Sequence, residues 1–308
     1  MPKLNGGSRQ VLRTGLMALL LVGGSASYGQ MLANASSKLE FDVASVRQNT
    51  SDAQPSSNFP LGPGAMYSET GGVFTARHQP VWIYIMFAYK MTDHEVHSVR
   101  KQLPGWALDV AYDIEARTES QSATKDEMRA MMQALLAERF KLTVHRSSDE
   151  VPVYALVQLT PGKLGPKLRV HPADDTSCSS AVPASGTPQT TEGGFPVICG
   201  GAALLPGSAP GRLAVGYRDV PLTLIAKQMS AMGGLERPVV DETGLRGNYD
   251  FALEFSPQLP PDVMPPPDYN PGPSFQQALA AQTGLKLVAQ KADVEVIVVD
   301  HIERPSEN

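Results

Sequence analysis

Apolar residues recur along the chain at two spacings, and this pattern predicts a protein that contains both helices and strands. In residues 124–140, methionine and leucine recur every three or four positions, which gives a helix one apolar face. Thr124 and Glu127 form a capping box at the start of this segment, so we expect the helix to begin there. Residues 151–158 and 294–300 are rich in β-branched residues and favour strands.

The order of these elements repeats along the chain. Each copy reads as strand, helix, strand, helix and a final pair of strands, and polar segments at 145–150 and 289–293 predict that this pair is a hairpin. Tyr112-Asp113-Ile114 of the first copy matches Tyr249-Asp250-Phe251 of the second, which indicates a role in the shared fold. The predicted fold class is α+β: two related units with antiparallel-rich sheets and helices packed on one face.

Two segments lack this periodicity. Residues 171–210 are rich in Ser, Pro and Gly and contain both cysteines, while residues 257–273 hold eight prolines, which exclude a helix or a central strand. We therefore expect a first unit over residues 40–170, a loop over 171–210, and a second unit over 211–308 that contains the proline-rich loop.

The N-terminus has the pattern of a secretory signal peptide. Three basic residues precede an apolar run over residues 15–24, and small residues follow it, so we expect a signal peptide ending near residue 30. The run is shorter than the roughly 20 apolar residues that a membrane span needs. We expect export to the periplasm or the extracellular space, with no stable membrane span in the mature chain. An uncleaved anchor or a buried helix stays as the alternative.

The net negative charge of the chain argues against one class of partner, nucleic acids. The 308 residues carry a formal charge of −5, and loss of the signal segment leaves 23 basic against 31 acidic residues, or −8. An acidic chain does not fit a nucleic-acid binder, which usually has a basic surface.

The predicted compartment also changes the meaning of the two cysteines. In an oxidising compartment, Cys178 and Cys199 are expected to form a disulfide that closes the loop between them. Closing about 20 residues contributes roughly 3 kcal/mol in the chain-entropy model. Two unpaired thiols are the alternative.

Metal-ligating residues gather once, at Asp93, His94, Glu95 and His97. The two histidines lie three residues apart rather than in an H-E-x-x-H motif, and we expect a solvated loop there. His94 and His97 are therefore the only metal candidates, and we assign no metal site.

Catalytic signatures are few. Ser122 and Lys125 form an S-x-x-K motif, but the accompanying S-D-N and K-T-G elements are missing, so we interpret the serine as part of a helix start. Carboxylates occur in two groups, Asp109 with Asp113, and Asp241 and Glu242 with Asp250. Such acids act as a pair only when the fold sets their separation. We predict no catalytic and no cofactor-binding residues, because nucleotide-binding glycine motifs are also missing.

Aromatic residues concentrate in the first unit, where helical spacing favours a place in the core. Trp106 follows Pro104-Gly105 in an expected turn, so we regard it as the candidate for an exposed contact with a partner.

Several segments together resemble the soil-associated secreted protein family, a domain of unknown function that is expanded in Acidobacteria. The resemblance covers roughly residues 40–308 and is carried by FDVASVR, LLAERFKLTVHR, VPVYALV, RPVVDETGLRGNYDF and VEVIVVDHIERPSEN. It implies an exported protein with no established reaction. In some relatives a similar domain is fused to a membrane metallopeptidase of the antibiotic-sensor type, which implies a binding or sensing role by analogy.

These observations favour an exported, non-catalytic binding or interaction module with a possible sensing role. Its expected partner is an unidentified envelope protein or peptide, and no cofactor is expected. The alternative is an exported hydrolase with carboxylate or metal chemistry between the two units. A purely structural envelope protein is also compatible with the sequence.

Overall fold

The structure is a computed structural model that describes residues 39–182, 189–258, 264 and 272–305. The predicted signal segment 1–30 and most of the proline-rich segment 257–273 lie outside the described residues. Within the described residues, no helix is long and apolar enough to cross a membrane.

The first half of the fold is a four-stranded sheet in the order β1-β4-β3-β2, together with four helices. Every neighbouring pair in this sheet is antiparallel. Its core contains the fully buried rings of Phe74, Tyr84, Phe87 and Phe140. The elements are β1 (Val43–Gln48), β2 (Ser56–Ser57), β3 (Val73–Pro80), α1 (Val81–Ala88), α2 (Asp93–Gln102), α3 (Gly105–Asp109), β4 (Ala111–Arg117) and α4 (Lys125–Arg139).

The second half is a four-stranded sheet in the order β6-β10-β8-β7, again antiparallel throughout. Tyr217, Phe251 and Phe255 are buried in its core. The elements are β6 (Leu168–Val170), β7 (Gly201–Leu205), β8 (Leu213–Pro221), α5 (Leu222–Gly233), β9 (Val239–Asp241), β10 (Asn248–Phe255), α6 (Phe275–Ala278) and the π-helical turn η1 (Leu279–Thr283).

The two sheets have the same connectivity. In each, the first strand of the half pairs with the strand that carries the Tyr-Asp sequence, and that strand pairs with the one leading into a helix. Gln48 lies opposite Tyr112 in the first sheet, and Val170 lies opposite Tyr249 in the second. The predicted α+β class with antiparallel-rich sheets is confirmed.

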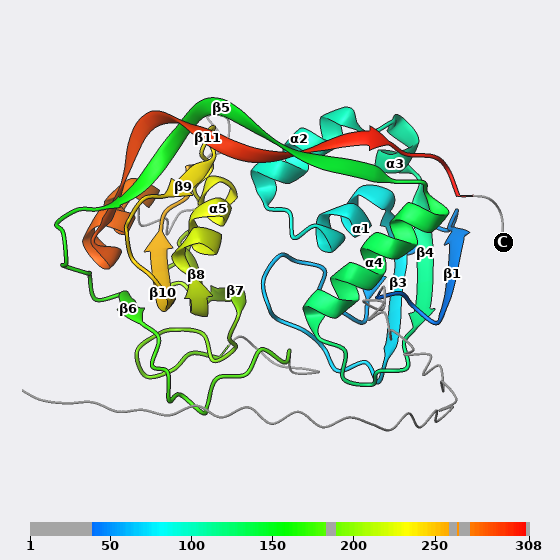
Figure 1. The fold of residues 1–308 in the computed structure, drawn as a ribbon. Coiled ribbons are helices and arrows are strands. Elements are labelled where there is room, and N and C mark those ends of the chain that lie inside the picture. Colours follow the sequence, from blue (N-terminus) through cyan, green and yellow to red (C-terminus); the bar gives the residue numbers. More distant parts are fainter. Residues whose placement is uncertain (1–38, 183–188, 259–263, 265–271, 306–308) are drawn as a thin grey trace, which may run out of the picture. The chain divides into compact units, whose positions relative to one another are not determined.

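A long two-stranded ribbon joins the halves. Strand β5 (Thr143–Gln158) pairs antiparallel with β11 (Leu285–His301) along its whole length, and β9 adds to β5 in parallel (Figure 1). Each strand begins next to its own half and ends on the other, because Leu156 of β5 is buried in the second core and Ile297 of β11 in the first.

The two predicted hairpins are therefore wrong. Residues 145–150 and 289–293 continue as strand instead of turning, because neither segment has the Asn-Gly or Gly-rich sequence that a tight hairpin turn requires. Residues 145–150 pair with residues 293–298, and residues 289–293 pair with residues 150–154. The ion pairs Arg146–Glu295 and Lys291–Glu150 join the two strands across the ribbon.

Candidate functional site

Both halves contribute to the lining of a cleft of about 1360 Å³. The first half provides the loop around residues 63–72 and the start of α4. The second half provides the end of β8 and the first turns of α5. Ligand sites for small molecules usually measure about 300–1,000 Å³, so this cleft has room for a ligand of peptide size.

The two halves are joined along one side of the cleft by backbone hydrogen bonds. Ala65 N donates to Gly200 O at 2.5 Å, and Tyr67 N donates to Ser180 O at 2.9 Å. Gly64 permits this close approach, since a Cβ atom at that position would lie 2.5 Å from Gly200 O. The cleft loop is thus bonded to the loop that contains the cysteines.

Lys125, at the first position of α4, is the most unusual charged group in the cleft. Its side chain is buried, with 7% of the residue exposed, and Nζ donates to the Met66 carbonyl at 2.7 Å. Burial, together with the positive charges of Arg129 and Lys90, lowers the pKa of Lys125 to about 7, although the charge of Asp126 opposes the shift. Within the described part of the chain, its ammonium group forms no ion pair with a carboxylate, and the adjacent Asp126 pairs with Lys90 and Arg129 instead.

Two more cations share one carboxylate beside Lys125. Asp126 forms ion pairs with Lys90 and with Arg129, each at 2.7 Å. Arg129 is itself buried, and its Nη2 donates to the carbonyls of Gly62, Pro63 and Gly64 at 3.1, 2.9 and 2.8 Å. The first-half wall of the cleft therefore carries three basic residues, Lys90, Lys125 and Arg129, against two acidic ones, Asp126 and Glu69.

The helices on both sides of the cleft add to this positive potential. α4 and α5 both begin at the cleft, and a helix N-terminus carries a partial positive charge. The N-terminus of α4 is closed by Thr124 and Glu127, which confirms the predicted capping box. α5 begins after Pro221 and has no side-chain cap, while its Lys227 pairs with Glu95 of α2 at 3.2 Å.

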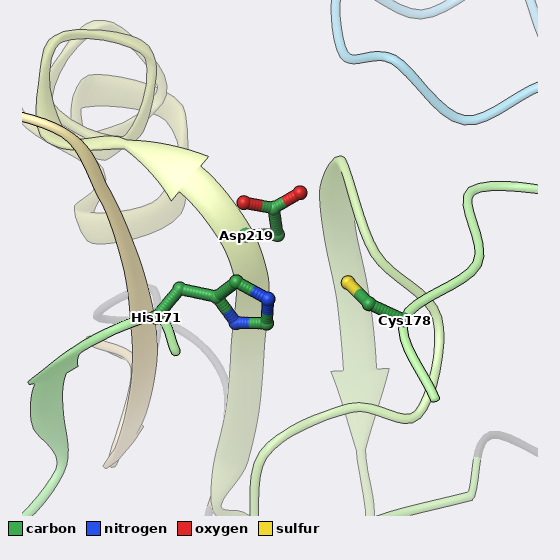
Figure 2. A group of neighbouring side chains, drawn as sticks. All are labelled: His171, Cys178 and Asp219. Atoms are coloured by element: carbon green, nitrogen blue, oxygen red, sulfur yellow. The ribbon is translucent and has the colours of Figure 1, made fainter. Parts of the chain in front are cut away.

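A second group of polar side chains lies beside the cleft, where His171, Cys178 and Asp219 are neighbours (Figure 2). Asp219 also lines the cleft. His171 follows β6, and its Nδ1 lies 2.7 Å from Oδ1 of the fully buried Asp250. Arg169 donates to the other oxygen of Asp250 at 2.9 Å, and the Asp219 amide donates to Oδ1 at 3.2 Å.

The predicted disulfide is confirmed. Cys178 is bonded to Cys199, with Cα atoms 5.7 Å apart, so its sulfur is not a thiolate in this structure. The bond lies in the loop that the cleft residues Ser180 and Gly200 also belong to.

The first half has a matching but simpler arrangement around Asp113. Its Oδ1 accepts hydrogen bonds from the Asn49 side chain and from the His78 amide, each at 2.8 Å. His78 and Asp219 both have a left-handed backbone, with φ of 52° and 56°, at irregularities in β3 and β8. The repeated Tyr-Asp sequence therefore supplies a carboxylate that binds the amide of an irregular strand residue in both halves.

The metal candidates His94 and His97 do not lie in the cleft lining. The expected solvated loop is wrong, because residues 93–102 form α2, with His94 half-buried and His97 exposed. Thr92 and Glu95 make a capping box, with Thr92 N donating to Glu95 Oε2 at 2.8 Å. This T-x-x-E pattern was the sequence signal for a helix.

Trp106 lies in α3, partly buried against the first core. Its ring stacks on Phe140 with centroids 6.4 Å apart, and the Arg304 guanidinium lies 5.7 Å from its centroid. A contact between Trp106 and a partner stays a prediction.

The S-x-x-K residues both line the cleft, but they do not share a helical turn. Ser122 precedes the N-cap Thr124 and is exposed, whereas Lys125 is buried. The S-x-x-K motif predicts no role for Lys125 on its own, and no motif predicts one for His171 or Asp219. No local motif marks these last two residues, since they come from distant segments.

Residues 83–302 match a family model described as "Protein of unknown function (DUF3738)". The chain belongs to this family. The DUF3738 match begins inside α1 and ends just after β11, so it includes α4, α5 and the ribbon but not the cleft loop at 63–72. No curated protein matches the chain, and no solved structure does.

Proposed function

We propose that this DUF3738 protein is an exported, non-catalytic binding module that holds an anionic ligand of peptide size in the cleft between its two halves. The observation that carries the proposal is Lys125, a buried cation whose ammonium group faces a backbone carbonyl instead of a carboxylate. A buried charge without a direct ion pair is costly, so an anion that forms one gains binding energy at this position.

The surroundings of Lys125 support the same ligand charge. Lys90 and Arg129 both pair with Asp126, and the N-termini of α4 and α5 lie at the same cleft. The lining holds four basic residues, Lys90, Lys125, Arg129 and Lys227, against three acidic ones, Glu69, Asp126 and Asp219. The protein as a whole is acidic, with a formal charge of −5, so a locally positive cleft is a departure from the rest of the chain. Such a field attracts negatively charged partners.

Export and the kind of partner rest on other observations. The basic, then apolar, then small residues at 1–30 favour a signal peptide, and the Cys178–Cys199 disulfide suits an oxidising compartment. An acidic segment of an envelope protein or peptide is the partner class that fits both the compartment and the volume of the cleft. A hydrolase that uses His94 and His97 as metal ligands in the cleft has less support, because neither residue lines the cleft.

Calorimetric titration with two synthetic hexapeptides, one rich in glutamate and one with glutamine at the same positions, tests the proposal. We expect the glutamate peptide to bind and the glutamine peptide to bind at least about tenfold more weakly, which corresponds to about 1.4 kcal/mol. Binding should weaken as the pH rises from 6 to 8.5, because Lys125, with a pKa of about 7, loses its charge over that range.

The matched variants are Lys125→Met in the cleft and Lys291→Met on the exposed ribbon, which remove the same charge at different places. Lys125→Met should abolish the preference for glutamate, and Lys291→Met should leave it unchanged. Equal affinity for both peptides, or equal loss in both variants, would contradict an anion site at Lys125.

A further inference from the structure

His171, Cys178 and Asp219 bring three different kinds of metal ligand together beside the cleft. One ligand atom from each, an imidazole nitrogen, a sulfur and a carboxylate oxygen, lies within 4.8 Å of the other two, and all three residues are half-buried. Figure 2 shows a ring nitrogen of His171 turned toward the space between Asp219 and Cys178.

His171 is already oriented as a ligand. Its Nδ1 is 2.7 Å from Asp250, whose carboxylate can only accept, so the proton lies on Nδ1 and the lone pair on Nε2. Asp250 is in turn fixed by Arg169 and by the Asp219 amide. Histidines that bind metals commonly donate their other ring N–H to a carboxylate in this way.

Asp219 offers a carboxylate that an ion can reach from solution. It lines the cleft, accepts a hydrogen bond from the Asn248 side chain at 2.8 Å, and forms no ion pair among the described residues. Its left-handed backbone at the irregularity in β8 directs the residue to this position.

Cys178 is held near His171 by more than its disulfide. The buried guanidinium of Arg218 donates to Asp175 and Ser177 before Cys178, and to the Val197 carbonyl before Cys199. Cys199 N also donates to Ser179 O at 2.8 Å. These bonds do not involve sulfur, so both arms of the loop keep their anchors when the S–S bond is broken.

We propose that reduction of the Cys178–Cys199 disulfide converts His171, Asp219 and Cys178 into a zinc-binding site at the edge of the cleft. Two equivalents of an external thiol supply the two electrons, and the products are the two cysteine thiols and the disulfide of the reductant. The half-buried Cys178 is the sulfur that the thiol reaches, because Cys199 is buried. On binding zinc, Cys178 releases its proton to solvent and coordinates as a thiolate.

The geometry requires only a small contraction. Zinc binds nitrogen or oxygen at about 2.0–2.2 Å and sulfur at about 2.3 Å, which places tetrahedral ligand atoms roughly 3.3–3.8 Å apart. The three side chains must therefore close by about 1 Å. Three protein ligands leave a fourth position for water or for a ligand in the cleft.

Two single-cysteine variants of the full chain give a matched test, since both abolish the disulfide and only one keeps the ligand set. Cys199→Ser retains Cys178, and Cys178→Ser removes it. We expect Cys199→Ser to bind zinc at least about tenfold more tightly than Cys178→Ser, measured by competition with a chromogenic chelator. Cobalt in Cys199→Ser should give a thiolate-to-metal charge-transfer band that Cys178→Ser lacks.

Wild-type protein, oxidised or reduced with a phosphine, tests the redox step, and the tight site should appear only after reduction. His171→Gln and Asp219→Asn should each weaken it, while His145→Gln, which alters another histidine–carboxylate pair, should not. Circular dichroism checks folding; if Cys199→Ser does not fold, reduced wild type against reduced His171→Gln decides. Equal zinc affinity of the two cysteine variants, or tight binding by the oxidised protein, would overturn the site.

This inference does not depend on the anionic ligand. Lys125→Met should leave zinc binding unchanged, so failure of the peptide experiment and failure of the zinc experiment are separate results.

Discussion

The two halves use the same position of the fold in different ways. After the first strand of the sheet comes Asn49 in one half and His171 in the other, and the irregular strand residue is His78 in one and Asp219 in the other. Around Asp113 the partners are a neutral amide and a backbone N–H, whereas around Asp250 they are an imidazole, a guanidinium and a backbone N–H.

The two halves share a structural feature, an aspartate that accepts a hydrogen bond from a backbone amide, and they differ in the side chains around it. Both halves keep an aspartate because the amide at the strand irregularity needs an acceptor. Only the second half surrounds it with groups that titrate or bind ions, and only there does the loop with the disulfide lie alongside. In a repeated fold, the aspartate of one copy can thus have a structural role only, while the aspartate of the other copy also orients residues that are able to bind a ligand.

The strongest test of this comparison is removal of the two aspartates. Asp250→Ala should lower the free energy of unfolding by about 3–5 kcal/mol, because it removes a fully buried carboxylate and leaves the half-buried His171 and the Asp219 amide without their acceptor. Asp113→Ala, which breaks two hydrogen bonds in a half-buried setting, should cost about 1–3 kcal/mol. Urea unfolding of both variants measures the difference, and equal losses would show that the two positions are equivalent.

The ribbon should be equally important to both halves. Leu156→Ala and Ile297→Ala each remove a buried side chain that anchors one strand in the opposite core, so we expect each to cost about 2–4 kcal/mol. Val288→Ala, on an exposed part of the same ribbon, should change stability by less than about 0.5 kcal/mol. If only one of these two variants loses much stability, then only one half depends on the strand that it receives from the other half.

Lys125 should make the stability of the first half depend on pH. Its pKa is lowered to about 7 in the folded protein, so between pH 7 and about 10 the unfolded chain binds more protons than the folded protein, and stability rises with pH. Wild type should therefore gain about 1–2 kcal/mol relative to Lys125→Met between pH 7 and 9. Denaturant unfolding at both pH values checks this, with Lys291→Met as a control that should show no such trend.

The smallest effect is expected at the paired irregular residues. His78 has a left-handed backbone and a buried Nδ1 with no hydrogen-bond partner among the described residues, so His78→Gly should raise stability by about 0.5–1 kcal/mol. Asp219→Gly loses the bond from Asn248 and should not stabilise. Thermal unfolding of the two variants compares them, and a destabilised His78→Gly would indicate that the imidazole packs favourably.

Local chemistry was readable from the sequence, whereas long-range pairing was not. The capping box of α4 and the pairing of Cys178 with Cys199 depend on neighbouring residues and on compartment, and both were predicted. The continuation of β5 and β11 through their polar segments was not predicted. A polar segment has the same sequence pattern in a turn as in an exposed strand whose partner is distant.

The residues of the candidate site were also missed because they lie far apart in the sequence. His171, Asp219 and Asp250 belong to different segments, and only the register of β6 and β8 against β10 brings them together. The histidines that do cluster in sequence, His94 and His97, lie on α2 away from the cleft. Spacing along the chain was therefore a poor guide to which histidine meets a carboxylate.

The ribbon also has a consequence for how the chain folds. Gln158 pairs with Leu285 and Thr143 pairs with His301. Every paired residue of β5 therefore has its partner more than a hundred residues later in the sequence. Contacts of such high sequence separation slow folding, and the first half reaches its native core only when Ile297 arrives. Until then a long strand edge is unpaired and open to association with other chains, which favours holding the chain unfolded until its synthesis is complete.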